Sequence, residues 1–132
     1  MNSEDDFRRA VIQAAGSKVH VSHIESHQSS AGIPDLNLYG LGQDLWLELK
    51  VVKEGHVRMR PTQRKWHRDR AERGGPSWVA VLNPVDGHVL VVRGATAAML
   101  ATGLLDWEAV AVIRTHYTNF GWLALLLGGT YD

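Results

Sequence analysis

The chain lacks cysteine altogether, which excludes disulfide bonds and metal sites built from thiolates. It also lacks net charge, because 14 Lys and Arg residues balance 14 Asp and Glu residues, so the overall charge does not indicate a nucleic-acid ligand. Long apolar runs are missing too. The longest covers residues 122–127, far short of the roughly 20 residues that cross a bilayer. We therefore expect a protein of a reducing compartment with no membrane association.

The first six residues are acidic and polar, whereas a signal peptide begins with basic residues. This start predicts a cytoplasmic or nucleoid-associated protein, or one in the host cytoplasm if the source is viral. Hydrophobic residues make up 45% of the 132 positions, which is enough for a core. At this length we expect a single domain over residues 1–132.

Helical and extended patterns alternate along the chain. Capping residues and apolar spacing predict helices at 4–15, 61–73 and 95–100, and apolar or alternating runs predict strands at 19–24, 36–39, 45–52, 78–82 and 88–92. The segment after Gly103 fits neither pattern clearly. The order indicates an α/β fold in which helices flank a mixed central sheet.

Two carboxylates and an amine lie where neighbouring strands can bring them together. Residues two apart on a strand share a face, so Glu48 and Lys50 project on one side while the leucines beside them project into the core. Asp35 stands at the start of the neighbouring strand, after Pro34. The predicted hairpin therefore places Asp35 beside Glu48.

This arrangement suits a divalent cation. Two carboxylates about 4 Å apart repel by roughly 4 kcal/mol at an effective dielectric near 20, and a dication reverses that repulsion. Mg²⁺ or Mn²⁺ would be held by Asp35, Glu48 and the main-chain carbonyl of Leu49, with water completing the shell. Lys50 would orient the attacking water in phosphodiester hydrolysis. The alternative is a solvated Glu-Lys pair and an ordinary Pro-Asp turn.

Basic residues are concentrated in one stretch. Nine of the 14 lie between positions 50 and 73, namely Lys50, Lys53, Arg58, Arg60, Arg64, Lys65, Arg68, Arg70 and Arg73. A local basic field can exist in a neutral protein, and we expect DNA contacts from Arg58, Arg60, Arg64, Lys65, Arg68 and Arg70. The alternative is a solvated helix. Trp66 is predicted to anchor this helix to the core, although it could instead stack on a base.

The chain resembles the VRR-NUC nucleases of the PD-(D/E)xK superfamily over roughly residues 4–92. The resemblance rests on an acidic residue opening the first helix, a Gly-x-Pro-Asp motif, a Glu-x-Lys motif and a glutamine opening the next helix. These are Glu4, Gly32-Ile33-Pro34-Asp35, Glu48-Leu49-Lys50 and Gln63. It implies a restriction-endonuclease-like core, metal-dependent DNA cleavage, and homodimers similar to Holliday-junction resolvases.

The resemblance also implies individual roles. Gln63 would orient the site, Glu4 would be an additional metal ligand, and Ser30 would donate to a phosphate. Two positions depart from the family pattern. Ala31 replaces a frequent basic residue, which removes a phosphate contact, and Arg60 replaces a serine that would cap the helix.

These observations predict a Mg²⁺- or Mn²⁺-dependent DNA endonuclease that is selective for branched DNA such as a Holliday junction. Three alternatives remain: a non-catalytic DNA-binding subunit with the nuclease fold, a protein whose basic helix meets an acidic partner, and an RNA endonuclease. The late apolar segment, residues 120–127, either closes the core or forms a dimer surface.

Overall fold

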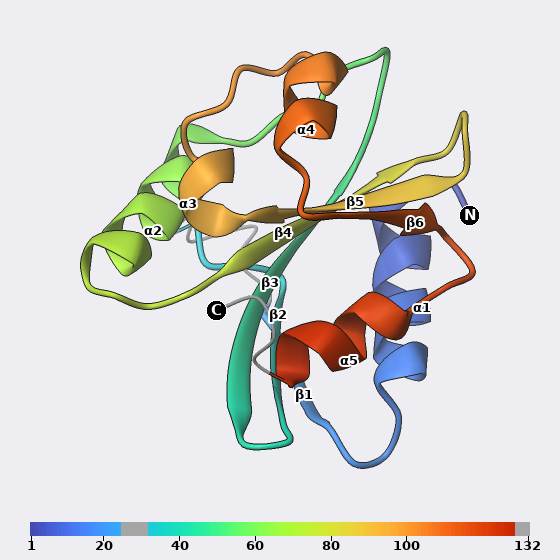
Figure 1. Cartoon of the computed structure of the whole chain (residues 1–132), viewed down its shortest axis with the longest axis vertical. Coiled ribbons are helices and arrows are strands. Elements are labelled where there is room, and N and C mark those ends of the chain that lie inside the picture. Colours follow the sequence, from blue (N-terminus) through green and yellow to red (C-terminus); the bar gives the residue numbers. More distant parts are fainter. Residues whose placement is uncertain (25–31, 129–132) are drawn as a thin grey trace.

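The computed structural model describes residues 1–24 and 32–128. Its helices are α1 (Glu4–Ala15), α2 (Pro61–Glu72), α3 (Gly94–Ala97), α4 (Leu104–Val110) and α5 (Gly121–Leu127). Its strands are β1 (His20–His23), β2 (Leu36–Gly40), β3 (Gln43–Val51), β4 (Trp78–Asn83), β5 (His88–Arg93) and β6 (Ile113–His116). Figure 1 shows these elements around one sheet. The predicted α/β class is confirmed.

The strands form one six-stranded sheet in the order β1-β2-β3-β4-β5-β6. β3 and β4 are parallel, and α2 makes the crossover between them, whereas the other neighbouring pairs are antiparallel. The sheet is therefore mixed, as predicted. The predicted hairpin is β2–β3, in which Leu36 pairs with Leu47. Because Asp35 directly precedes Leu36, this register brings Asp35 beside Glu48.

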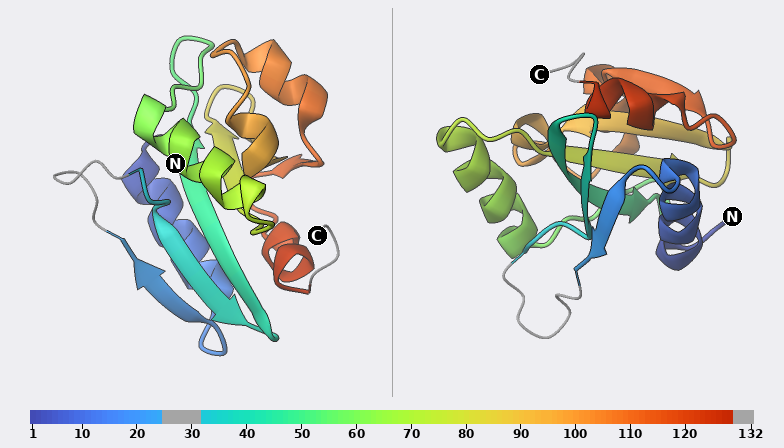
Figure 2. Two further views of the ribbon diagram at one scale, coloured as in Figure 1. Left: turned by 90° about the vertical axis from the view of Figure 1, so that its left-hand side faces the viewer. Right: turned by 90° about the horizontal axis from the view of Figure 1, so that it is seen from below.

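Helices cover both faces of the sheet. Figure 2 shows α1 and α2 on opposite sides of it. On one face α1 and α5 pack on alternate residues of the strands, and the buried cluster there includes Phe7, Val11, Leu47, Leu49, Trp122 and Leu126. On the other face the buried cluster includes Val57, Val79, Val81, Ala97 and Trp107, where α3 and α4 contribute. Lys50 pairs with Val81 across β3–β4, so the side chains of Glu48 and Lys50 project on this second face.

The segment after Gly103 contains α4, β6 and α5, elements that the sequence pattern leaves ambiguous. Trp122, Leu123, Leu126 and Leu127 are buried against the first cluster. The apolar segment therefore closes the core, and only Leu125 among its large apolar side chains is strongly exposed, at 41%. No helix in the described ranges is long and apolar enough to cross a bilayer.

Candidate active site

The acidic and basic side chains of β3 lie inside the protein. Glu48 is 1% exposed and Lys50 8% exposed, because α2 covers the face onto which both project. The strand thus has apolar Leu47, Leu49 and Val51 on one face and the polar pair on the other. The alternative of a solvated ion pair is wrong, since water reaches neither side chain freely.

Asp35 is fixed from two directions by the main chain. Its carbonyl accepts a hydrogen bond from the Ile24 amide at 2.8 Å, and its Oδ2 accepts one from the Leu49 amide at 2.9 Å. The amide and carbonyl of a strand residue lie on the same edge, so the Leu49 carbonyl also lies on the side of Asp35. The β2–β3 register places Asp35 opposite Glu48, so the two carboxyl groups are neighbours.

Gly32 holds the Asp35 segment against α2. It has φ +76°, and a Cβ there would overlap the Thr62 carbonyl and come within 2.7 Å of the Gln63 amide nitrogen. Only glycine permits this approach without strain. The motif glycine is therefore the contact that brings the aspartate-bearing segment to the first turn of the helix.

Gln63 connects the polar groups of β3 with the start of α2. Its Oε1 accepts from Lys50 Nζ at 2.9 Å and from the Arg60 amide at 2.8 Å. Its Nε2 lies 3.4 Å from Glu48 Oε2. Gln63 thereby supplies the helix cap that the Arg60 side chain lacks, and it fixes the Lys50 ammonium beside the carboxylates.

Burial and the neighbouring Asp35 both disfavour the charged form of Glu48. Burial raises the pKa of Glu48 well above its ordinary value, and the neighbouring Asp35 carboxylate raises it further, against the opposing effect of Lys50. Glu48 Oε1 is buried without a hydrogen-bond partner among the described residues. A buried, unpaired carboxylate oxygen next to a second carboxylate fits a divalent cation, which would supply the missing partner.

Glu4 lies at the start of α1, close to the same groups. Desolvation raises the pKa of its carboxyl group; Lys50 lowers that pKa and Asp35 raises it. Glu4 and Lys50 also line one cavity. No cluster of three or more acidic or histidine side chains in the described residues is placed to hold a metal ion. The role of Glu4 as a further ligand therefore stays a prediction.

The predicted DNA-binding side chains separate into two groups. Arg58, Arg60 and Arg68 are exposed. In contrast, Arg64 donates to the Leu100 carbonyl at 2.6 Å, Lys65 pairs with Asp69, and Arg70 stacks over Trp46 and Trp66 at 5.5 and 4.7 Å from the ring centroids. Arg64 therefore ties α2 to the end of α3. Ser30 lies outside the described residues.

The prediction that Trp66 anchors α2 in the core is wrong. Its ring is partly exposed and packs on Trp46, with 5.5 Å between centroids. His67 is the buried side chain instead, and its Nδ1 lies 2.7 Å from Ser77 Oγ. Burial, and then the Lys50 charge, lower the pKa of His67 to about 4. His67 lies four residues after Gln63 and therefore on the same face of the helix. This spacing could have predicted that His67, and not Trp66, faces the interior.

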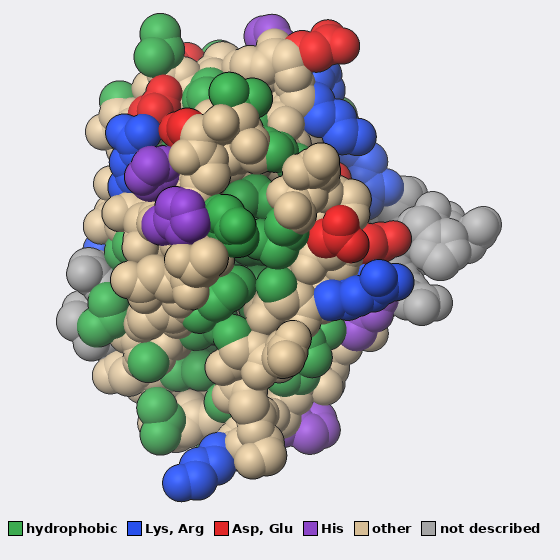
Figure 3. Space-filling view, turned by 90° about the vertical axis from the view of Figure 1, so that its right-hand side faces the viewer, with side chains coloured by type: hydrophobic (Ala, Val, Ile, Leu, Met, Phe, Trp, Pro, Cys, Tyr) green, Lys and Arg blue, Asp and Glu red, His purple; other side chains and the backbone are tan. Residues whose placement is uncertain are grey.

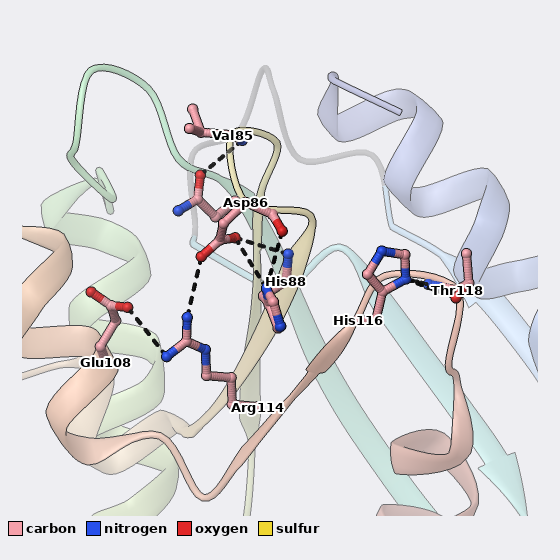
Figure 4. Close-up of polar contacts among 8 residues, drawn as sticks. Val85, Asp86, His88, Glu108, Arg114, His116 and Thr118 are labelled. Carbon is pink, nitrogen blue, oxygen red and sulfur yellow. Dashed lines mark hydrogen bonds and ion pairs between the residues drawn. The ribbon is translucent and has the colours of Figure 1, made fainter.

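A second group of polar side chains lies around the turn between β4 and β5 and on the adjoining α4 and β6, away from α2. Figure 4 shows Arg114 between Asp86 and Glu108, at 3.3 and 3.8 Å. The His88 amide donates to Asp86 Oδ1 at 2.9 Å, and His116 contacts Thr118. Figure 3 views the molecule from its right-hand side in Figure 1, where acidic, basic and histidine side chains surround exposed apolar ones. We call Asp86, His88, Glu108 and Arg114 the surface network.

Comparison with known proteins supports the fold. No family model matches the sequence, and no curated protein matches it either, so the resemblance to VRR-NUC nucleases is not confirmed. Among solved structures, the chain is similar to Hjc, a Holliday junction resolvase from the archaeal hyperthermophile Archaeoglobus fulgidus. The TM-score is 0.51 at 16% identity, covering 70% of this chain and 76% of Hjc. The fold is thus restriction-endonuclease-like.

Proposed function

We propose that this protein is a divalent-metal-dependent DNA endonuclease that cuts branched DNA. The observation that carries the proposal is the buried Glu48 carboxyl group with one unpaired oxygen, beside the half-buried Asp35 and next to Lys50. A buried carboxyl group whose pKa is strongly raised, as that of Glu48 is, is more typical of a functional site than of a surface ion pair. The similarity in fold to a Holliday junction resolvase suggests DNA, and a four-way junction in particular, as the substrate.

Each side chain has a task in this reaction. Asp35, Glu48 and the Leu49 carbonyl would hold Mg²⁺ or Mn²⁺, with Glu4 as a further ligand. The bound cation would polarise the phosphate and promote deprotonation of the attacking water. Lys50 donates to a non-bridging phosphate oxygen as negative charge grows on it, and Gln63 keeps the ammonium in that position. Water adds to phosphorus and the bond to the 3′ oxygen breaks, which leaves a 3′-hydroxyl and a 5′-phosphate.

Branch selectivity would follow from two copies of the chain. In a homodimer, two such sites could cut opposed strands of a four-way junction. Arg58, Arg60 and Arg68 are exposed around the start and the outer side of α2 and would contact phosphates. Arg64, Lys65 and Arg70 would contribute only after leaving their present partners.

A cleavage panel tests the proposal. Linear, nicked, flap and four-way-junction DNA, with a matched RNA duplex, are incubated with Mg²⁺, Mn²⁺ or EDTA. We expect metal-dependent cutting that is fastest on the junction, and none with EDTA. Junction binding without any metal-dependent cutting would instead identify a non-catalytic DNA-binding subunit. Preferential cutting of the RNA duplex would identify an RNA endonuclease.

A further inference from the structure

The cavity lined by Glu4 and Lys50 extends beyond the carboxylate site. It has a volume of about 150 Å³ and is lined by Glu4, Lys50, Val51, Lys53, His56 and Arg58. Glu4 and Lys50 belong to both places, so the cavity is continuous with the site where a phosphate would be cut. Three of its six lining residues are cationic and one is acidic, so the cavity favours an anion.

The cavity wall is a tight turn at the end of β3. The Lys53 and His56 main chains exchange two hydrogen bonds, at 3.0 and 2.9 Å. The two residues between them, Glu54 and Gly55, have φ of 52° and 73°. Positive φ at both central positions is the geometry of a two-residue hairpin turn, and glycine is favoured in it. The turn therefore presents Lys53 and His56 from a defined backbone.

The turn is also fastened to the chain before α4. The Val57 amide donates to the Thr102 carbonyl at 2.8 Å, and the Leu104 amide donates to the Gly55 carbonyl at 3.0 Å. His56 Nδ1 lies 3.0 Å from Thr102 Oγ1. These contacts hold the wall of the cavity in place before any ligand arrives, which lowers the ordering cost of binding.

The charged groups of Lys53 and Arg58, in the wall of this cavity, have few protein partners among the described residues. Neither Lys53 nor Arg58 forms an ion pair within the described residues. Arg58 makes one long hydrogen bond, 3.4 Å from Nη1 to the Lys53 carbonyl. Their charges are thus available to an oxyanion, and Arg58 can bind two oxygens at once.

We propose that this cavity binds a DNA backbone phosphate next to the one that is cut, with Lys53 and Arg58 as its ligands and His56 in its wall. This inference rests on the proposed function, because the shared residues Glu4 and Lys50 put the cavity next to the scissile phosphate only if the carboxylates hold that phosphate through a metal ion. The bound phosphate would set the register of the strand, so that cutting falls at one bond.

The test uses Lys53→Ala, Arg58→Ala and a control, Lys18→Ala, in the full chain. Lys18 is exposed beyond the end of α1 opposite Glu4. The cut position in junction DNA is mapped first. Affinity is then measured in EDTA, at several salt concentrations, for junctions carrying one uncharged methylphosphonate at successive positions around that bond. Thermal melting confirms that each variant is folded.

For the wild type we expect one methylphosphonate position, adjacent to the cut, to weaken binding about tenfold. Lys53→Ala should bind unmodified DNA about tenfold more weakly, lose the effect of that methylphosphonate, and lower the salt slope by about one. Lys18→Ala should match the wild type.

A Lys53→Ala protein that keeps full sensitivity to the methylphosphonate, or that binds and cuts like Lys18→Ala, would refute the phosphate subsite while leaving the proposed nuclease intact. A wild type that neither binds nor cuts any DNA in the panel would refute both.

Discussion

Asp35 and Glu48 lie under α2, where Glu48 is 1% exposed, whereas the Asp86 side chain of the surface network is 35% exposed. In the surface network each Asp86 oxygen has a donor, from the His88 amide and from Arg114. In the buried site, Glu48 Oε1 has none among the described residues. Both regions contain carboxylates beside cations. The two regions therefore differ in desolvation and in unpaired carboxylate oxygens rather than in the presence of acids, and the proposed cation site rests on that difference.

Asp35→Asn against Asp86→Asn is the strongest test of that difference. The amide oxygen at position 35 can still accept from the Leu49 amide, so the fold is expected to survive, but the proposed metal ligand is removed. We expect junction cleavage to fall by about a thousandfold or more, and Asp86→Asn to cut like the wild type. Single-turnover cleavage with Mg²⁺ measures both. Equal cleavage rates for Asp35→Asn and Asp86→Asn would show that the buried site and the surface network do not differ in their importance for cutting.

Glu48→Gln should affect stability as well as cutting. The raised pKa of Glu48 in the folded state means that its contribution to stability is present below its ordinary pKa of about 4.5 and is lost as the pH rises through the folded-state pKa. Without metal, the wild type should therefore lose about 1.4 kcal/mol relative to Glu48→Gln for each pH unit in that window.

Urea unfolding in EDTA at pH 4 and pH 7 measures this change. The variant should equal the wild type at pH 4 and exceed it at pH 7, while Mg²⁺ should stabilise only the wild type. The same stability difference at both pH values would contradict a raised pKa for Glu48 in the folded state.

Gln63→Leu should lower the free energy of unfolding, because it removes an acceptor that two donors share. Lys50 Nζ and the Arg60 amide would both lose their partner, at a cost of about 1–3 kcal/mol. Gln13→Leu, at an exposed position on α1, provides the matched control and should change stability by less than about 0.5 kcal/mol. Urea unfolding compares them, and equal midpoints would mean that Gln63 does not connect β3 with α2.

Arg114→Ala should have the smallest effect. Its ion pairs with Asp86 and Glu108 involve an arginine side chain that is 52% exposed, and exposed pairs contribute at most about 1 kcal/mol. We expect a shift below that size, which disappears in high salt, and unchanged cleavage. Thermal melting at low and high salt is sufficient; a larger, salt-resistant loss would give the surface network a structural role comparable to that of the buried site.

The sequence predicted those parts of the fold that follow from local periodicity. The period of two on β3 placed Glu48 and Lys50 together, and the hairpin spacing brought Asp35 to them. Proline at the first position of α2 located that helix correctly. The assignment of these residues to metal binding and catalysis remains a prediction.

Tertiary packing decided what the sequence did not reveal. The burial of Glu48 and Lys50 depends on α2 crossing the sheet, and the burial of His67 in place of Trp66 depends on where Ser77 lies. Arg64 reaches a carbonyl 36 positions away, and the turn at Lys53 and His56 depends on contacts with Thr102. These relations join distant segments and leave no local pattern.

Gly32 gives the molecule an unusual point of weakness. Because its hydrogen lies directly against the Thr62 backbone, one added methyl group at this position would wedge the aspartate-bearing segment away from the helix that carries Gln63. Every ionisable group would still be present, yet Asp35 and Gln63 would no longer lie close together. Natural variation at this position should therefore be confined to glycine even in relatives whose chemistry has changed.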